Sequence, residues 1–96
     1  DHFYALHYLG ILYYQRREYD YAVEHIKKAL LSNPTDPHAY YNLGNVFKDK
    51  GQFDEAANYF QKSLQLNPDN ADAYNNKGIV HKEQGQFKGW VKDKGE

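Results

Sequence analysis

A repeat of 34 residues is the feature that most constrains the fold of this chain. Glycine, alanine, aromatic, asparagine and proline positions all recur at this interval. A period of this length is typical of helical arrays, in which each unit buries its apolar face against the next. The recurring sets are Gly10/Gly44/Gly78, Ala5/Ala39/Ala73, Tyr19/Phe53/Phe87, Asn33/Asn67 and Pro34/Pro68.

Each unit reads as a pair of amphipathic helices. In the stretch 37–70, apolar residues recur at three- and four-residue steps, the spacing that places side chains on one helical face. Gly51 stands between the two helices, and Pro68 ends the second because proline cannot continue a helix. Asp36 and Asn70 are suitable N-caps for the helices that follow them. The pattern predicts helices near 2–16, 19–32, 37–50, 53–66 and 71–84.

The middle unit carries a recognisable set of residues in register: Tyr40, Leu43, Gly44, Phe47, Gly51, Phe53, Ala56, Phe60, Ser63 and Pro68. This set resembles the tetratricopeptide repeat (TPR) family, from whose pattern only Ser63 departs, since alanine is usual there. The resemblance implies an all-α fold, a right-handed superhelix (TPR solenoid) of two full helical hairpins and a partial third. Residues 1–96 would form one domain with repeats at 3–36, 37–70 and 71–96.

The first and third units depart from this pattern at single positions. Arg17 replaces the turn glycine of the first unit, which is unfavourable if the backbone has a positive φ there. Small residues at Gly10 and Ala22 should let the two helices of that unit approach closely. At the same register, Gly44 and Gly78 should also pack against companion helices.

The third unit follows the pattern as far as Phe87 and is degenerate after it. Trp90 stands where a second helix has alanine, and an indole would not fit between close-packed helices. We therefore expect the fifth helix to be a terminal cap, with Lys77 and His81 facing water. The tail 88–96 would be frayed or loosely helical.

Composition excludes several classes of function. The 12 basic and 13 acidic residues are interspersed and give a net charge of −1, which argues against a nucleic-acid surface. No apolar run could cross a bilayer and no signal peptide is recognisable, so we expect a cytoplasmic protein. Cysteine is absent, which removes disulfides and thiolate metal sites. Methionine is absent even at position 1, which indicates an excised or processed piece of a longer chain.

Residues for catalysis or metal binding do not cluster in the sequence. The five histidines are scattered and lack spaced partner ligands. Asp54 and Glu55 stand at the start of a helix, where negative charge complements the helix dipole. No phosphate loop or nucleophile motif is present. We therefore expect no enzymatic activity, no cofactor and no metal site.

The TPR resemblance implies that the first helix of each unit lines a concave groove. Aromatic rings with a polar tip, together with short amides, suit the binding of a peptide main chain. Several of these tyrosines could equally fill gaps between helices. We predict a non-catalytic module that binds a peptide or partner helix in its groove through Tyr4, His7, Tyr8, Ile11, Tyr14, His38, Tyr41, Asn42, Asn45, Lys48, Asn75, Asn76, Ile79 and Lys82.

One TPR subclass grips the C-terminal carboxylate of chaperones with lysine and asparagine side chains. The corresponding places here hold His7, Ile11, Asn42, Asp72 and Asn76, of which only Asn42 agrees. Asp72 would repel a carboxylate, so this ligand is not expected.

A second subclass is a better match. The phrases AYYNLGNVFKDKGQFDEA and NPDNADAYNNKGIVHKEQGQF resemble the repeat arms of O-GlcNAc transferases and related prokaryotic proteins. In those arms an asparagine ladder binds peptide main chain, and Asn42 and Asn76 match its register. The alternatives are therefore a substrate-targeting arm of a larger enzyme such as a protein glycosyltransferase, or a folding model without a specific ligand. Weak self-association through the exposed C-terminal end is also expected.

Overall fold

The computed structural model describes the backbone of residues 2–95 and the side chains of residues 2–86. The described residues form five α-helices and no strand. Four of the helices begin and end within a residue of their predicted bounds, which confirms the helical prediction for the first two units. The helices are α1 (His2–Gln15), α2 (Tyr19–Ser32), α3 (Pro37–Asp49), α4 (Phe53–Leu66) and α5 (Ala71–Gly95).

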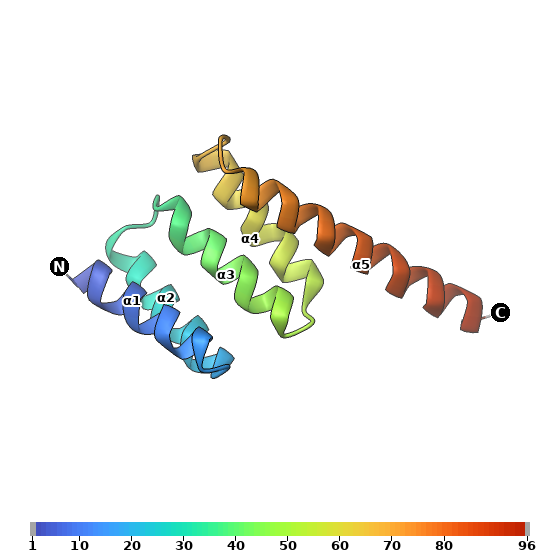
Figure 1. Cartoon of the computed structure of the whole chain (residues 1–96), viewed down its shortest axis with the longest axis horizontal. Helices are drawn as coiled ribbons and strands as arrows, with labels where there is room; N and C mark the ends of the chain where they lie inside the picture. Colours follow the sequence, from blue (N-terminus) through green and yellow to red (C-terminus); the bar gives the residue numbers. More distant parts are fainter. Residues whose placement is uncertain (1, 96) are drawn as a thin grey trace.

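The helices are arranged in two layers (Figure 1). Helices α1 and α2 form one hairpin, α3 and α4 form the next, and α5 packs on α4. One layer consists of α1, α3 and α5, in which α1 contacts α3 and α3 contacts α5. In the described part of the chain, no Cα atom of α2 lies within 8 Å of one in α4. The stack therefore curves with α1, α3 and α5 on its inner side, as expected of a helical repeat superhelix. We call the surface of these three helices the inner wall.

The turns inside the two hairpins have the same geometry. The amide of Glu18 donates to the carbonyl of Tyr13, and the amide of Gln52 donates to the carbonyl of Phe47, both at 2.9 Å. The residue before each amide has a left-handed backbone, with φ of 63° at Arg17 and of 79° at Gly51. Glycine adopts this conformation at no steric cost, whereas arginine does not. The expected strain at Arg17 is confirmed.

Side-chain caps start the helices that follow the two loops. The carboxylate of Asp36 accepts a hydrogen bond from the amide of Ala39 at 3.1 Å, and Pro37 occupies the first turn of α3. The side-chain oxygen of Asn70 accepts from the amide of Ala73 at 3.1 Å. Both caps satisfy an amide that has no partner inside the helix. The predicted caps are therefore correct.

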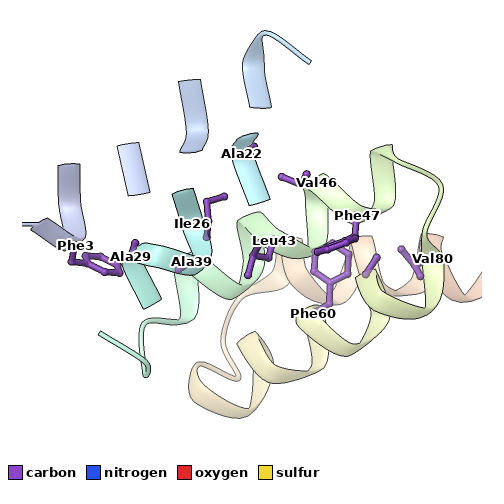
Figure 2. Packing of buried hydrophobic residues seen from close by; sticks show 11 residues of the cluster. Phe3, Ala22, Ile26, Ala29, Ala39, Leu43, Val46, Phe47, Phe60 and Val80 are labelled. Carbon is purple, nitrogen blue, oxygen red and sulfur yellow. The ribbon is translucent and has the colours of Figure 1, made fainter. Parts of the chain in front are cut away.

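Small residues bring the two helices of each hairpin close together. Ile26 of α2 lies against Gly10 of α1, and the Phe60 ring of α4 lies against Gly44 of α3. Both bulky side chains are fully buried in a core to which all five helices contribute (Figure 2). The labelled core residues are Phe3, Ala22, Ile26, Ala29, Ala39, Leu43, Val46, Phe47, Phe60 and Val80.

The third unit differs from its prediction at two points. Helix α5 continues without a turn to Gly95, and nothing lies within 4 Å of a Cβ built on Gly78. The expectation that Gly78 packs against a companion helix is therefore wrong. Lys77 is half-buried, and its Nζ donates to Gln61 Oε1 of α4 in a solvent-exposed hydrogen bond. His81 is exposed, as expected.

A second helix in the third unit would lack the features that start and bury α4. Helix α4 carries Asp54 and Glu55 in its first turn, where the corresponding residues after Phe87 are a lysine and a glycine. Ala56 is fully buried, and its counterpart is Trp90. Gly85 therefore stays helical within α5, although Gly51 at the same repeat position turns the chain. The tail 88–96 was predicted to be frayed or loosely helical. Its backbone is helical as far as Gly95, and its side chains lie outside the described residues.

Candidate functional site

All fourteen predicted contact residues belong to α1, α3 and α5, but their side chains differ in exposure. His7 is buried, with only 9% of its surface exposed. A second group is half-buried: Ile11, Tyr14, Tyr41, Asn42, Asn45, Lys48 and Asn76. A third group is exposed: Tyr4, Tyr8, His38, Asn75, Ile79 and Lys82. The prediction thus combined buried and half-buried residues, which pack within the inner wall, with residues whose side chains are exposed on it.

The first junction of the wall joins α1 to α3. The amide nitrogen of Asn42 lies 2.8 Å from His7 Nε2 and donates to it, because an amide NH2 group has no acceptor. The imidazole is therefore neutral, with its proton on Nδ1. Burial lowers the pKa of His7 below its usual 6.5, and His38 acts in the same direction while Asp36 opposes them. The Phe3 ring packs on the same imidazole with 5.4 Å between ring centroids.

The second junction joins α3 to α5 and is centred on Asn76. Its amide nitrogen donates to Asn45 Oδ1 at 2.8 Å and to Tyr41 Oη at 3.3 Å. Tyr41 holds the repeat position of His7, and Asn76 holds that of Asn42. The same pair of positions therefore connects the neighbouring inner helices at both junctions.

A further bond joins the C-terminal ends of α1 and α3. The hydroxyl of Tyr14 donates to Asp49 Oδ2 at 2.5 Å. Burial and this hydrogen bond both raise the pKa of the Tyr14 phenol above its usual 10.0. The bond thus engages the hydroxyl of Tyr14, one of the predicted groove residues.

The side chains that remain exposed define what the wall could bind. Tyr4 and Tyr8 of α1 are 69% and 63% exposed, and Ile79 of α5 is 43% exposed. His38 on α3 adds an exposed imidazole, and Asn75 on α5 adds an exposed amide. Apolar rings flanked by hydrogen-bonding groups suit a chain with alternating side chains and main-chain amides.

Two features of the molecule were missed from the sequence. Phe3 is 2% exposed and supports His7, although no periodic position marks it as core. A cavity of about 390 Å³ also opens beside α4, on the side of the hairpin away from the predicted contact residues. The signal for this cavity is the pair of stacked tyrosine rings, Tyr40 and Tyr59, on the two helices of one hairpin. Its lining residues are Tyr40, Glu55, Asn58, Tyr59 and Lys62.

The described residues show neither a metal-ligand cluster nor a membrane-spanning helix. Those residues contain no group of three or more His, Cys, Asp or Glu side chains placed to hold a metal ion. None of the described helices is long and apolar enough to span a bilayer.

Comparisons with known proteins identify the repeat. The family model "TPR repeat" matches residues 10–51 and 44–85. The chain is similar to three solved structures of MamA, one of them a mutant. "Crystal structure of MamA" is 26% identical with a TM-score of 0.85, and the match covers 96% of this chain and 55% of that one.

The other two structures give a similar picture. "Crystal structure of MamA protein" is 27% identical with a TM-score of 0.84, over 94% of this chain and 49% of that one. The mutant is 27% identical with a TM-score of 0.80, over 92% and 64%. This chain therefore spans roughly half to two-thirds of those chains. A search of curated proteins finds no match. The finer resemblance to O-GlcNAc transferase repeat arms stays a prediction.

Proposed function

Because the chain belongs to the TPR repeat family, we propose that it is a non-catalytic protein-interaction module whose inner wall binds an extended peptide or a partner helix. The observation that supports the proposal is the exposure of Tyr4 and Tyr8 on α1 together with Ile79 on α5. These side chains lie on the helices that form one curved layer (Figure 1). A partner laid across the layer would therefore meet apolar surface at both ends.

The chemistry of the exposed residues favours a peptide over a small molecule. Tyrosine provides a large contact area at a low cost in side-chain entropy, because it has few rotatable bonds. Asn75 and His38 can donate and accept hydrogen bonds along a main chain. Lys82 adds a positive charge beside them, while Asp72 on the same helix keeps the wall near neutrality.

The half-buried amides have a different role in this proposal. Asn42 and Asn76 bond to neighbouring inner helices, so their amide nitrogens are engaged before any ligand arrives. They fix the spacing of the inner helices. Asn76 uses both of its N–H donors and presents only its oxygen, whereas Asn42 keeps one N–H and its oxygen for a ligand. The ligand is therefore held mainly by the exposed rings, and not by an asparagine ladder of free amides.

The experiment is a selection followed by matched substitutions. Phage-displayed random peptides are selected on the full chain, and the dissociation constant of the best peptide is measured for each variant. Tyr8→Ala should weaken binding by about tenfold or more, since a central aromatic contact contributes at least about 1.4 kcal/mol. Tyr21→Ala is the control, because Tyr21 is 56% exposed on α2, outside the wall.

Comparing the two variants distinguishes binding at the inner wall from binding elsewhere on the surface. Equal losses in Tyr8→Ala and Tyr21→Ala, or none in either, would contradict the proposal. Helical circular dichroism of both variants establishes that the fold is retained. Substituting exposed tyrosines is preferable to substituting Asn42, whose removal would also break the α1–α3 junction.

A further inference from the structure

The two junctions of the inner wall use the same pair of repeat positions but different acceptors. Asn42 donates to His7 Nε2 at the α1–α3 junction, and Asn76 donates to Tyr41 Oη at the α3–α5 junction. An imidazole ordinarily titrates near pH 6.5 and a phenol near pH 10. Only the first junction therefore has an acceptor that changes its protonation state close to neutral pH.

Protonation of His7 would replace a hydrogen bond with two opposed donors. An imidazolium carries N–H groups on both ring nitrogens, so Nε2 would face the NH2 group of Asn42. His7 as a whole is 9% exposed, so little water reaches the ring to replace the lost acceptor while the helices stay together.

The charged groups around the His7 ring have opposite effects on its pKa. From the start of α3, Asp36 favours the charged imidazole and His38 disfavours it. The Asp36 carboxylate already accepts from the amide of Ala39 as the cap of α3, which fixes its position. From α1 itself, the neighbouring group is the Phe3 ring, which offers no charge. Burial is the largest influence on the ring and favours the neutral form.

We propose that His7 and Asn42 form a proton-sensitive latch that holds the N-terminal half of α1 against α3 and opens when His7 is protonated. The bond from Tyr14 to Asp49 joins the other ends of α1 and α3 and keeps its proton in acid. Opening therefore moves the N-terminal half of α1 away from α3, while α3 and α5 stay together. Because Tyr4 and Tyr8 lie on that half of α1, acid would also move them relative to α5.

The sign of the pH effect follows from the neutral state of the buried ring. The folded chain holds His7 unprotonated at pH values where the unfolded chain has begun to bind a proton. The latch therefore contributes its full stability above the ordinary pKa of about 6.5, and this contribution is lost as the pH falls below it.

Distances between spin labels test the latch directly. The chain has no cysteine, so labels can be placed on introduced cysteines without removing others. The pair Ala5→Cys/Asp72→Cys spans both junctions, and the pair Thr35→Cys/Asp72→Cys spans only the second; all three sites are exposed. Between about pH 7.5 and about pH 5, the first distance should lengthen and broaden, and the second should not change.

His7→Tyr is the matched variant, because it gives the first junction the acceptor that the second junction already has. In this variant the acid-induced change in the Ala5–Asp72 distance should disappear. Asn42→Asp is a second variant that offers only acceptor atoms to the imidazolium. It should raise the pKa of His7 above that of the wild type and keep the latch closed in acid.

Two results would overturn the latch. One is an unchanged Ala5–Asp72 distance in the wild type across this pH range, and the other is an acid-induced change that persists in His7→Tyr. If His7→Tyr does not fold, NMR of the wild type decides the question. The side-chain NH2 signals of Asn42 should then move with the same midpoint as the His7 ring signals, and a midpoint unrelated to His7 would refute the proposal.

Discussion

The Phe60 ring fills the space beside Gly44, so that a Cβ built on Gly44 would lie 2.5 Å from Phe60 Cε1. Gly10 is in contact with Ile26 in the same way, whereas the equivalent position at Gly78 is open. One repeat position therefore has two environments. The packed glycines set how closely the helices of a hairpin approach, and the open glycine is simply an exposed residue in a helix.

Gly44→Ala should lower the free energy of unfolding. The added methyl group overlaps a buried ring that cannot move aside, and overpacking of this kind costs about 1–3 kcal/mol. The better helix propensity of alanine returns up to about 1 kcal/mol, so a net loss is expected. Urea unfolding followed by circular dichroism measures the difference. An unchanged or increased unfolding free energy would show that the hairpin tolerates a wider spacing.

Gly78→Ala is the matched control and should have the opposite sign. The added Cβ meets no atom within 4 Å, so only the change in helix propensity remains. The unfolding free energy should rise by about 0.5–1 kcal/mol. A loss of stability would mean that the face around Gly78 is covered in solution, for example by self-association through the C-terminal end.

Arg17→Gly should stabilise the first hairpin. Arg17 has a φ of 63°, and the left-handed conformation costs a side-chain-bearing residue about 1–2 kcal/mol. Because glycine gains flexibility in the unfolded chain, the net gain should be about 0.5–1 kcal/mol. Thermal unfolding measures it, and Gly51→Ala at the same turn of the second hairpin should show a loss. If both substitutions change stability in the same direction, backbone strain does not explain the result.

Tyr14→Phe should change how stability depends on alkaline pH. The folded chain keeps the Tyr14 proton above pH 10, where the unfolded chain loses it. This stabilisation is complete below pH 10 and is lost as the pH rises further. The wild type should therefore lose more stability between about pH 8 and about pH 11 than Tyr14→Phe does. Tyr8→Phe is the control from the same helix and should behave like the wild type.

The sequence predicts the features that depend on local chemistry. The bounds of α3, its Asp36 cap and the left-handed turn at Gly51 all follow from residues within one or two helical turns of each other. The approach of α3 and α4 at Gly44 also follows, because the 34-residue period puts a glycine in the same place as Gly10 of the first hairpin.

The hydrogen bonds across the wall could not be predicted in the same way. His7–Asn42, Tyr41–Asn76 and Tyr14–Asp49 each join residues 35 apart, one more than the repeat. The offset reflects how far one hairpin is rotated and shifted on the next, which no periodicity specifies.

The straight course of α5 was also missed. The sequence repeats the turn phrase Gly-Gln-Phe at 85–87, yet α5 continues through it. After the phrase, Trp90 stands at the repeat position of the buried Ala56. The residues up to Phe87 therefore predict a turn into a second helix, whereas the residues after Phe87 argue against that helix.

The central claim is that the inner wall of α1, α3 and α5 is the surface that receives a partner chain. NMR chemical shifts of the protein, recorded while a selected peptide is added, test it most directly. The largest changes should fall on Tyr4, Tyr8, Asn75 and Ile79, with Tyr21 unaffected. Changes centred on α2 and α4, or on the cavity beside Tyr59, would contradict the claim.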